Sequence, residues 1–113
     1  MTVPVAAAAQ VLTVTIQEAI RANTELKKCR MQEETKRAAI EAELEARMYT
    51  IKEQYHAIAQ AQQGHHEEVM EILKVCSEVA TNPNLSDARV KMILEMQFEF
   101  YKEAKNMAFR SRH

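Results

Sequence analysis

Turn-forming and aromatic residues are scarce in this chain. Its 113 residues include one glycine, two prolines, no tryptophan, three phenylalanines and three tyrosines. An all-β fold needs a turn between successive strands, and so few turn residues cannot supply them. Most of the other residues are strong helix formers such as Ala, Glu, Lys, Arg, Gln and Met. The sequence therefore predicts an all-α protein, and its length suits a single domain.

A strong net charge and a cysteine framework are lacking as well. Fifteen Lys and Arg oppose sixteen Asp and Glu, so no global charge favours nucleic acid or a membrane surface. Cys29 and Cys76 lie far apart and form no CxxC pair, which favours free thiols in the reducing cytoplasm. No apolar run reaches the ~18 residues of a membrane span. The apolar residues 1–14 lack a basic leading region, and we expect them to form a flexible arm.

Motifs for catalysis and cofactor binding are also missing. There is no glycine-rich phosphate loop, no GxSxG, and no Ser, Thr or Cys with a recognisable base. His65 and Glu68 share a helical face, but the HExxH pattern is absent and no third metal ligand is evident. The sequence predicts a non-enzymatic protein without a cofactor, a metal or a small-molecule substrate.

Two segments carry helix-boundary signals. Thr15 and Glu18 have the spacing of a capping box, in which each side chain satisfies a backbone amide at a helix start. The one cluster of turn residues is TNPNLSD at 81–87, where Pro83 cannot continue a helix and Asn84 or Ser86 can cap the next one. The predicted elements are a long helix over 15–81, a turn over 82–85 and an antiparallel return helix over 86–110.

Gly64 could interrupt the long helix. Apolar residues nevertheless keep one heptad register from Leu44 to Val79, without insertion or deletion. A turn usually shifts such a register, because its length is not restricted to a multiple of seven. One interior glycine costs about 1 kcal/mol, which a long helix tolerates. The sequence therefore favours a helical hairpin of the coiled-coil type, and the alternative is a three-helix bundle broken at Gly64.

The return helix is too short to cover the whole long helix. It would lie opposite residues 58–81 with a broad core face that includes Ile93, Leu94, Phe100 and Tyr101. A stripe of large apolar residues upstream would then have no partner within the chain. Each such side chain contributes about 1.5–3 kcal/mol when buried. The sequence predicts that this stripe is a seam for a second copy or another protein, formed by Leu44, Met48, Ile51, Tyr55 and Ile58.

Upstream of this seam, the same heptad positions become polar. They are occupied by Asn23, Lys27, Arg30, Glu34, Arg37 and Glu41. Charged residues at these positions exclude a tight apolar coiled coil. The segment 23–41 is interpreted as a solvated helix, or alternatively as a polar docking surface.

One charged and aromatic stripe stands out on the return helix. Its five residues fall within a sector of about 60° at 100° per residue, and they are Lys91, Phe98, Lys102, Lys105 and Phe109. Glu95 interrupts the sector. Aromatic rings between lysines suit either a contact with another subunit or protein, or a nucleic-acid backbone.

These patterns favour a self-associating protein that binds another protein, as an adaptor, inhibitor, chaperone or assembly component. The alternative is nucleic-acid binding through the lysine and aromatic stripe, against which the near-neutral net charge argues.

Overall fold

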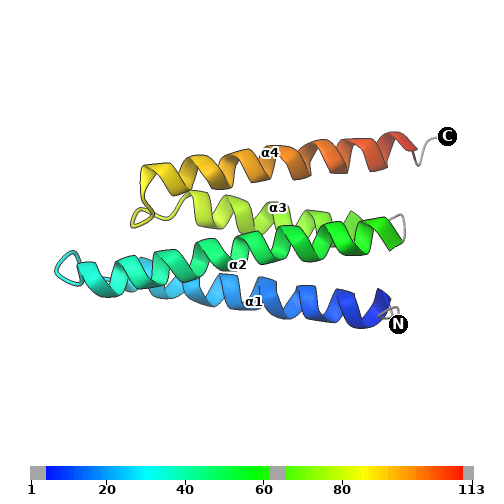
Figure 1. Cartoon of the computed structure of the whole chain (residues 1–113). Helices are drawn as coiled ribbons and strands as arrows, with labels where there is room; N and C mark the ends of the chain where they lie inside the picture. The colour runs from blue at the N-terminus through cyan, green and yellow to red at the C-terminus, as the bar shows by residue number, and fades with distance from the viewer. Residues whose placement is uncertain (1–4, 62–65, 111–113) are drawn as a thin grey trace.

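The structure, a computed structural model, describes residues 5–61 and 66–110, and these residues contain four helices. They are α1 (Val5–Lys28), α2 (Glu34–Ala61), α3 (His66–Ala80) and α4 (Asp87–Arg110) (Figure 1). No strand occurs in these residues. The prediction of an all-α protein is confirmed.

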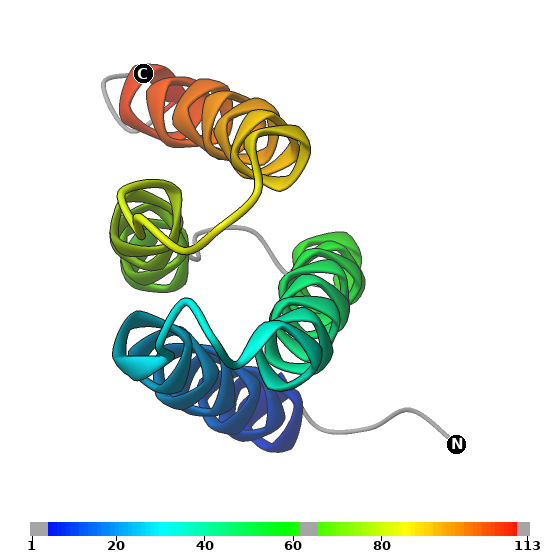
Figure 2. The ribbon, with the colours of Figure 1, turned by 90° about the vertical axis from the view of Figure 1, so that its left-hand side faces the viewer.

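Successive helices run in opposite directions, so the chain forms two helical hairpins, α1–α2 and α3–α4 (Figure 1). The main packing contacts join α1 to α2, α3 to α4, and α1 to α3. The view along the helices places α4 at one edge of the molecule and α1 near the other (Figure 2). The result is flat, with extents of 53 × 31 × 17 Å.

One hydrophobic core joins the two hairpins. Each helix contributes apolar residues at intervals of three or four, the spacing that keeps side chains on one helical face. The core includes Leu12, Ile16, Ala19 and Leu26 of α1, Ile40, Leu44, Met48, Ile51, Tyr55 and Ile58 of α2, Val69, Ile72, Cys76 and Val79 of α3, and Ile93, Met96 and Phe100 of α4.

The predicted continuous helix over 15–81 is wrong. Helix α1 ends at Lys28 and α2 begins at Glu34, while α2 ends at Ala61 and α3 begins at His66. Gly64 itself lies outside the described residues. The heptad register is unbroken because the apolar faces of α2 and α3 pack into the same core. An unbroken register therefore indicates that the residues are buried, and it does not show that they belong to one continuous helix. The alternative prediction, a three-helix bundle broken at Gly64, also differs from the structure, because it did not separate α1 from α2.

The first residues of the chain also differ from the prediction of a flexible arm over 1–14. Residues from Val5 onward belong to α1, and Leu12 is fully buried. Thr15 lies inside this helix, where its hydroxyl donates a hydrogen bond to the Val11 carbonyl at 3.0 Å and caps no helix start. An alanine-rich segment favours a helix, and the core gives Leu12 and Ile16 a place to be buried.

The C-terminus of α1 is capped by the distant turn between α3 and α4. No glycine follows Lys28, although helices commonly use one to satisfy their last carbonyls. Instead, the Asn84 amide donates to the carbonyls of Leu26 at 2.7 Å and Cys29 at 3.2 Å. The buried Asn82 amide donates to the carbonyl and side-chain oxygens of Asn23 at 3.0 and 2.7 Å. These bonds tie the two hairpins together.

The start of α4 is held by α2 in a similar way. The Ser86 backbone amide donates to the buried Glu41 carboxylate at 2.6 Å. A carboxylate is favourable here because the helix N-terminus carries partial positive charge. Arg89 of α4 then pairs with Glu45 at 2.7 Å and with Glu41 at 3.6 Å. Helix α4 is therefore anchored at its N-terminal end by polar contacts.

Replacing Asn84 by alanine should lower the free energy of unfolding by about 1–3 kcal/mol, because carbonyls at the end of α1 lose their donor. Urea denaturation measures the change. The matched control is Asn106→Ala, which removes the same amide from an exposed position of α4 and should alter stability by less than about 0.5 kcal/mol. Equal effects of the two substitutions would contradict the capping role.

Candidate docking surface on the fourth helix

The predicted seam of Leu44, Met48, Ile51, Tyr55 and Ile58 lies in the core. Each of these residues is at most 2% exposed. The expectation that nothing in the chain covers them is wrong, because α1 folds back along α2. The exposed apolar surface of the molecule must be sought elsewhere.

Such a surface occurs on α4, along the side that faces away from the bundle. Leu94, Phe98 and Tyr101 are 48%, 59% and 52% exposed. Their spacing of four and three residues places them on one helical face. Charged residues flank them. This surface, called here the outer face of α4, consists of Leu94, Phe98 and Tyr101 together with Lys91, Glu95, Lys102 and Lys105.

The structure brings four of the five predicted stripe residues onto this outer face. Lys91, Phe98, Lys102 and Lys105 are all exposed. The Lys102 ammonium lies 4.6 Å from the centre of the Phe98 ring, and that of Lys105 lies 5.6 Å from the centre of the Tyr101 ring. Both are within the range of a cation–π contact. The side chain of Phe109 lies outside the described residues.

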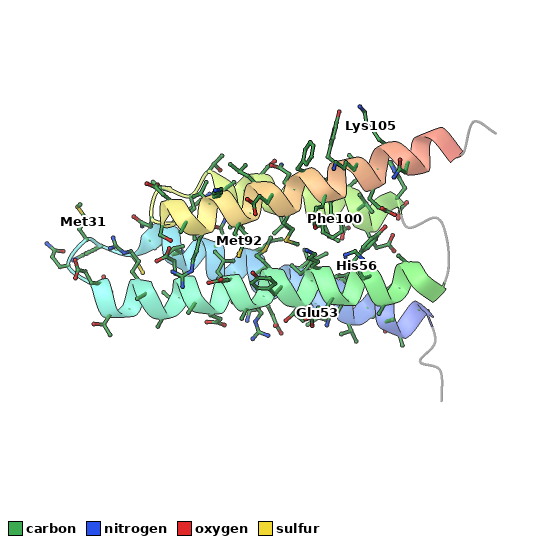
Figure 3. The ribbon with its side chains drawn as sticks, turned by 45° about the horizontal axis from the view of Figure 1, so that its top comes forward. Met31, Glu53, His56, Met92, Phe100 and Lys105 are labelled. Carbon is green, nitrogen blue, oxygen red and sulfur yellow. The ribbon has the colours of Figure 1, made fainter. Side chains whose placement is uncertain are left out.

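Leu94 and Tyr101 were expected in the core and are instead on the outer face. The core side of α4 is defined by Ile93, Met96 and Phe100, which are all buried. In Figure 3, Phe100 points from α4 toward α2, whereas Lys105 points away from the bundle. The predicted core face was too broad because one partner helix was assumed to cover it. A narrower face centred on Met96 would have left Leu94 and Tyr101 outside.

A hollow adjoins the N-terminal half of the outer face. Its lining combines three apolar side chains with two acidic ones and one basic one: Val90, Leu94, Phe98, Asp87, Glu95 and Lys91. A lining of apolar and charged side chains suits a side chain that has an apolar body and a polar end. The hollow could therefore receive an aromatic or lysine side chain from another protein.

The opposite side of α4 is fixed against α2, which sets the direction of the outer face. The rings of Tyr55 and Phe100 meet edge to face with centroids 5.1 Å apart, a favourable arrangement for aromatic pairs. Lys52 of α2 pairs with Glu99 of α4 at 3.0 Å. These contacts hold α4 in one rotation about its axis.

The buried hydroxyl of Tyr55 lowers the stability of the folded chain. Its hydroxyl is buried without a hydrogen-bond partner among the described residues. Burial, followed by the negative charges of Glu103 and Glu68, raises its pKa from 10.0 to about 12. Burial also raises the pKa of the Cys76 thiol from 9.0 to about 12. Neither group is therefore readily ionised near neutral pH.

Other functional signals are limited in the described part of the chain. No group of three or more His, Cys, Asp or Glu there is arranged to hold a metal ion. His65, named above with Glu68, lies outside the described residues. Within the four helices as described, none has an apolar stretch long enough to cross a bilayer. Comparison with protein-family models, curated proteins and solved structures gives no match.

Replacing Tyr55 by phenylalanine should raise the free energy of unfolding by about 1 kcal/mol, because a buried hydroxyl without a partner is removed. Urea denaturation at neutral pH measures the difference. The matched control is Tyr49→Phe, since the Tyr49 ring is half exposed on α2 and its hydroxyl should have little effect. A loss of stability in Tyr55→Phe would show that the hydroxyl is bonded in solution.

Stability should also fall as the pH rises from 9 to 12. Folding raises the pKa values of Tyr55 and Cys76 above 10.0 and 9.0, so the native state holds these protons more tightly than the unfolded chain. The stabilisation from these two groups is complete at pH values below their unfolded-state pKa values, and it is lost as the pH rises through about 12. Urea denaturation across this range should give a shallower decline for Tyr55→Phe and for Cys76→Ala. An unchanged slope in both variants would contradict these shifts.

Proposed function

We propose that this protein acts without catalysis, by binding a protein chain through the outer face of α4. The observation that carries the proposal is the exposure of Leu94, Phe98 and Tyr101 on one face of a helix at the edge of the bundle. A contact of this kind would serve an adaptor, inhibitor, chaperone or assembly component, each of which works by covering a partner's surface.

The energetics of the outer face support a protein contact. A large apolar side chain gains about 1.5–3 kcal/mol on complete burial, and about half of that remains available to these three residues. Aromatic residues near the centre of an interface commonly carry most of its binding energy. The flanking lysines and Glu95 would form the polar rim around this apolar centre.

Nucleic acid is the less favoured partner for the same surface. Single strands bind by stacking bases on aromatic rings within a positively charged groove. Here the ammonium groups of Lys102 and Lys105 lie over the rings of Phe98 and Tyr101, so a stacked base would have to displace them. Asp87 and Glu95 also line the hollow beside Phe98, and both would repel a phosphate backbone.

A photoreactive benzoylphenylalanine in place of Phe98 should cross-link to protein in living cells, because this ring would lie inside the contact. The control carries the same probe in place of Tyr49, which is half exposed on α2. Adding Leu94→Asp and Tyr101→Asp should reduce the Phe98 cross-link about tenfold or more. Equal cross-linking from the two positions, or an unchanged yield in the Asp variants, would overturn the proposal.

A further inference from the structure

We propose that the outer face of α4 binds a second copy of this chain, with the two α4 helices antiparallel and related by a two-fold axis near Phe98. This inference rests on the proposed function and names its partner. Two-fold dimers are the commonest soluble assemblies, and their interfaces must be self-complementary. The outer face meets that requirement in its apolar residues and in the charge pair beside them.

The apolar residues pair with one another in this arrangement. With Phe98 at the centre, Leu94 lies four residues before the axis and Tyr101 lies three residues after it. An antiparallel copy therefore places its Tyr101 at nearly the same height as Leu94, within about 1.5 Å along the helix axis. Both residues fall on the same side of Phe98 around the helix. Two Leu–Tyr contacts would flank a central pair of phenylalanine rings.

The charges on the other side of Phe98 are complementary. Glu95 lies three residues before the axis and Lys102 four residues after it, and both lie on the flank opposite Leu94 and Tyr101. In the antiparallel pair, each Glu95 therefore faces the Lys102 of the other copy, twice by symmetry. Lys102 already lies beside Phe98 in the single chain, 4.6 Å from its ring centre. Glu95, which interrupted the basic stripe, becomes the residue that makes the surface self-complementary.

The hollow on α4 fits the same arrangement. It lies at the N-terminal half of the outer face and is lined by Asp87, Val90 and Glu95 among others. The segment of the second copy that reaches it carries Tyr101, Lys102 and Lys105. The acidic residues of the lining would meet the lysines, and its apolar residues would meet the tyrosine ring.

Lys91 is the exception, and it provides a test of the geometry. Lys91 lies seven residues before Phe98 and Lys105 lies seven residues after it, so the antiparallel pair brings these like charges to the same height. Lys91→Glu should therefore strengthen association. A parallel pair or an unrelated partner gives no reason for that gain.

The experiment is sedimentation analysis of the purified, nuclease-treated full chain across a concentration series. The unmodified protein should form a dimer. Glu95→Lys and Lys102→Glu should each weaken it about tenfold, because each places two like-charge pairs at the interface. An equimolar mixture of the two variants should recover the dimer, since every facing pair is then opposite in sign. Unfolding midpoints of the variants check that the single chains remain folded.

The outcomes separate this inference from the proposed function. A monomer at every concentration, with the Phe98 cross-link to another protein retained in cells, overturns the second-copy inference and leaves the proposed function standing. A monomer with no Phe98 cross-link overturns both. A dimer that is insensitive to the charge reversals, or a mixture that fails to recover it, places self-association on another surface and overturns the inference.

Discussion

The hydrogen bonds from Asn82 and Asn84 to the end of α1 are the contacts on which the arrangement of the two hairpins depends. The last carbonyls of a helix need donors, and the α1–α2 connection contains neither glycine nor asparagine, the residues that most often cap a helix C-terminus. The α3–α4 turn supplies them from more than fifty residues away. The end of α1 thus receives these side-chain donors only when the second hairpin is docked, so the same hydrogen bonds cap α1 and join the two hairpins.

This docking also determines which surface remains open. Glu41 and Arg89 fix the start of α4 against α2, and the Tyr55–Phe100 contact fixes its middle. Once Ile93, Met96 and Phe100 face the core, Leu94, Phe98 and Tyr101 must face solvent, because they lie on the opposite side of the same helix. The exposure of three large apolar residues is therefore a consequence of how α4 is anchored. Packing within the chain does not explain why large apolar residues occupy these exposed positions.

Composition was enough to predict the helical class, and the turn residues at 81–87 predicted the final helix, but neither revealed the number of helices. The polar heptad positions between Asn23 and Glu41 were interpreted as a solvated helix or a docking surface, although the α1–α2 connection lies among them. In the sequence, this connection is marked only by the loss of apolar periodicity. It contains no Gly or Pro, the residues that usually mark the end of a helix, and Asn84 caps α1 instead. No local pattern reveals a cap from a distant turn. The lysines and Phe98 of the site were predictable from their spacing, whereas Leu94 and Tyr101 required knowledge of which face α4 buries.

Helices α2 and α4 differ in the side chains that they expose to solvent. Helices α1 and α3 pack against each other, and each also packs against the other helix of its own hairpin, α2 or α4. The exposed side of α2 beside Tyr49 carries Lys52, Glu53 and His56, which water solvates well. The exposed side of α4 carries an apolar centre instead. In the proposed dimer, a second α4 would cover this exposed side of the helix without altering the core. The proposed pairing of Glu95 with Lys102 beside this apolar centre would then select a second copy of the same chain as the partner.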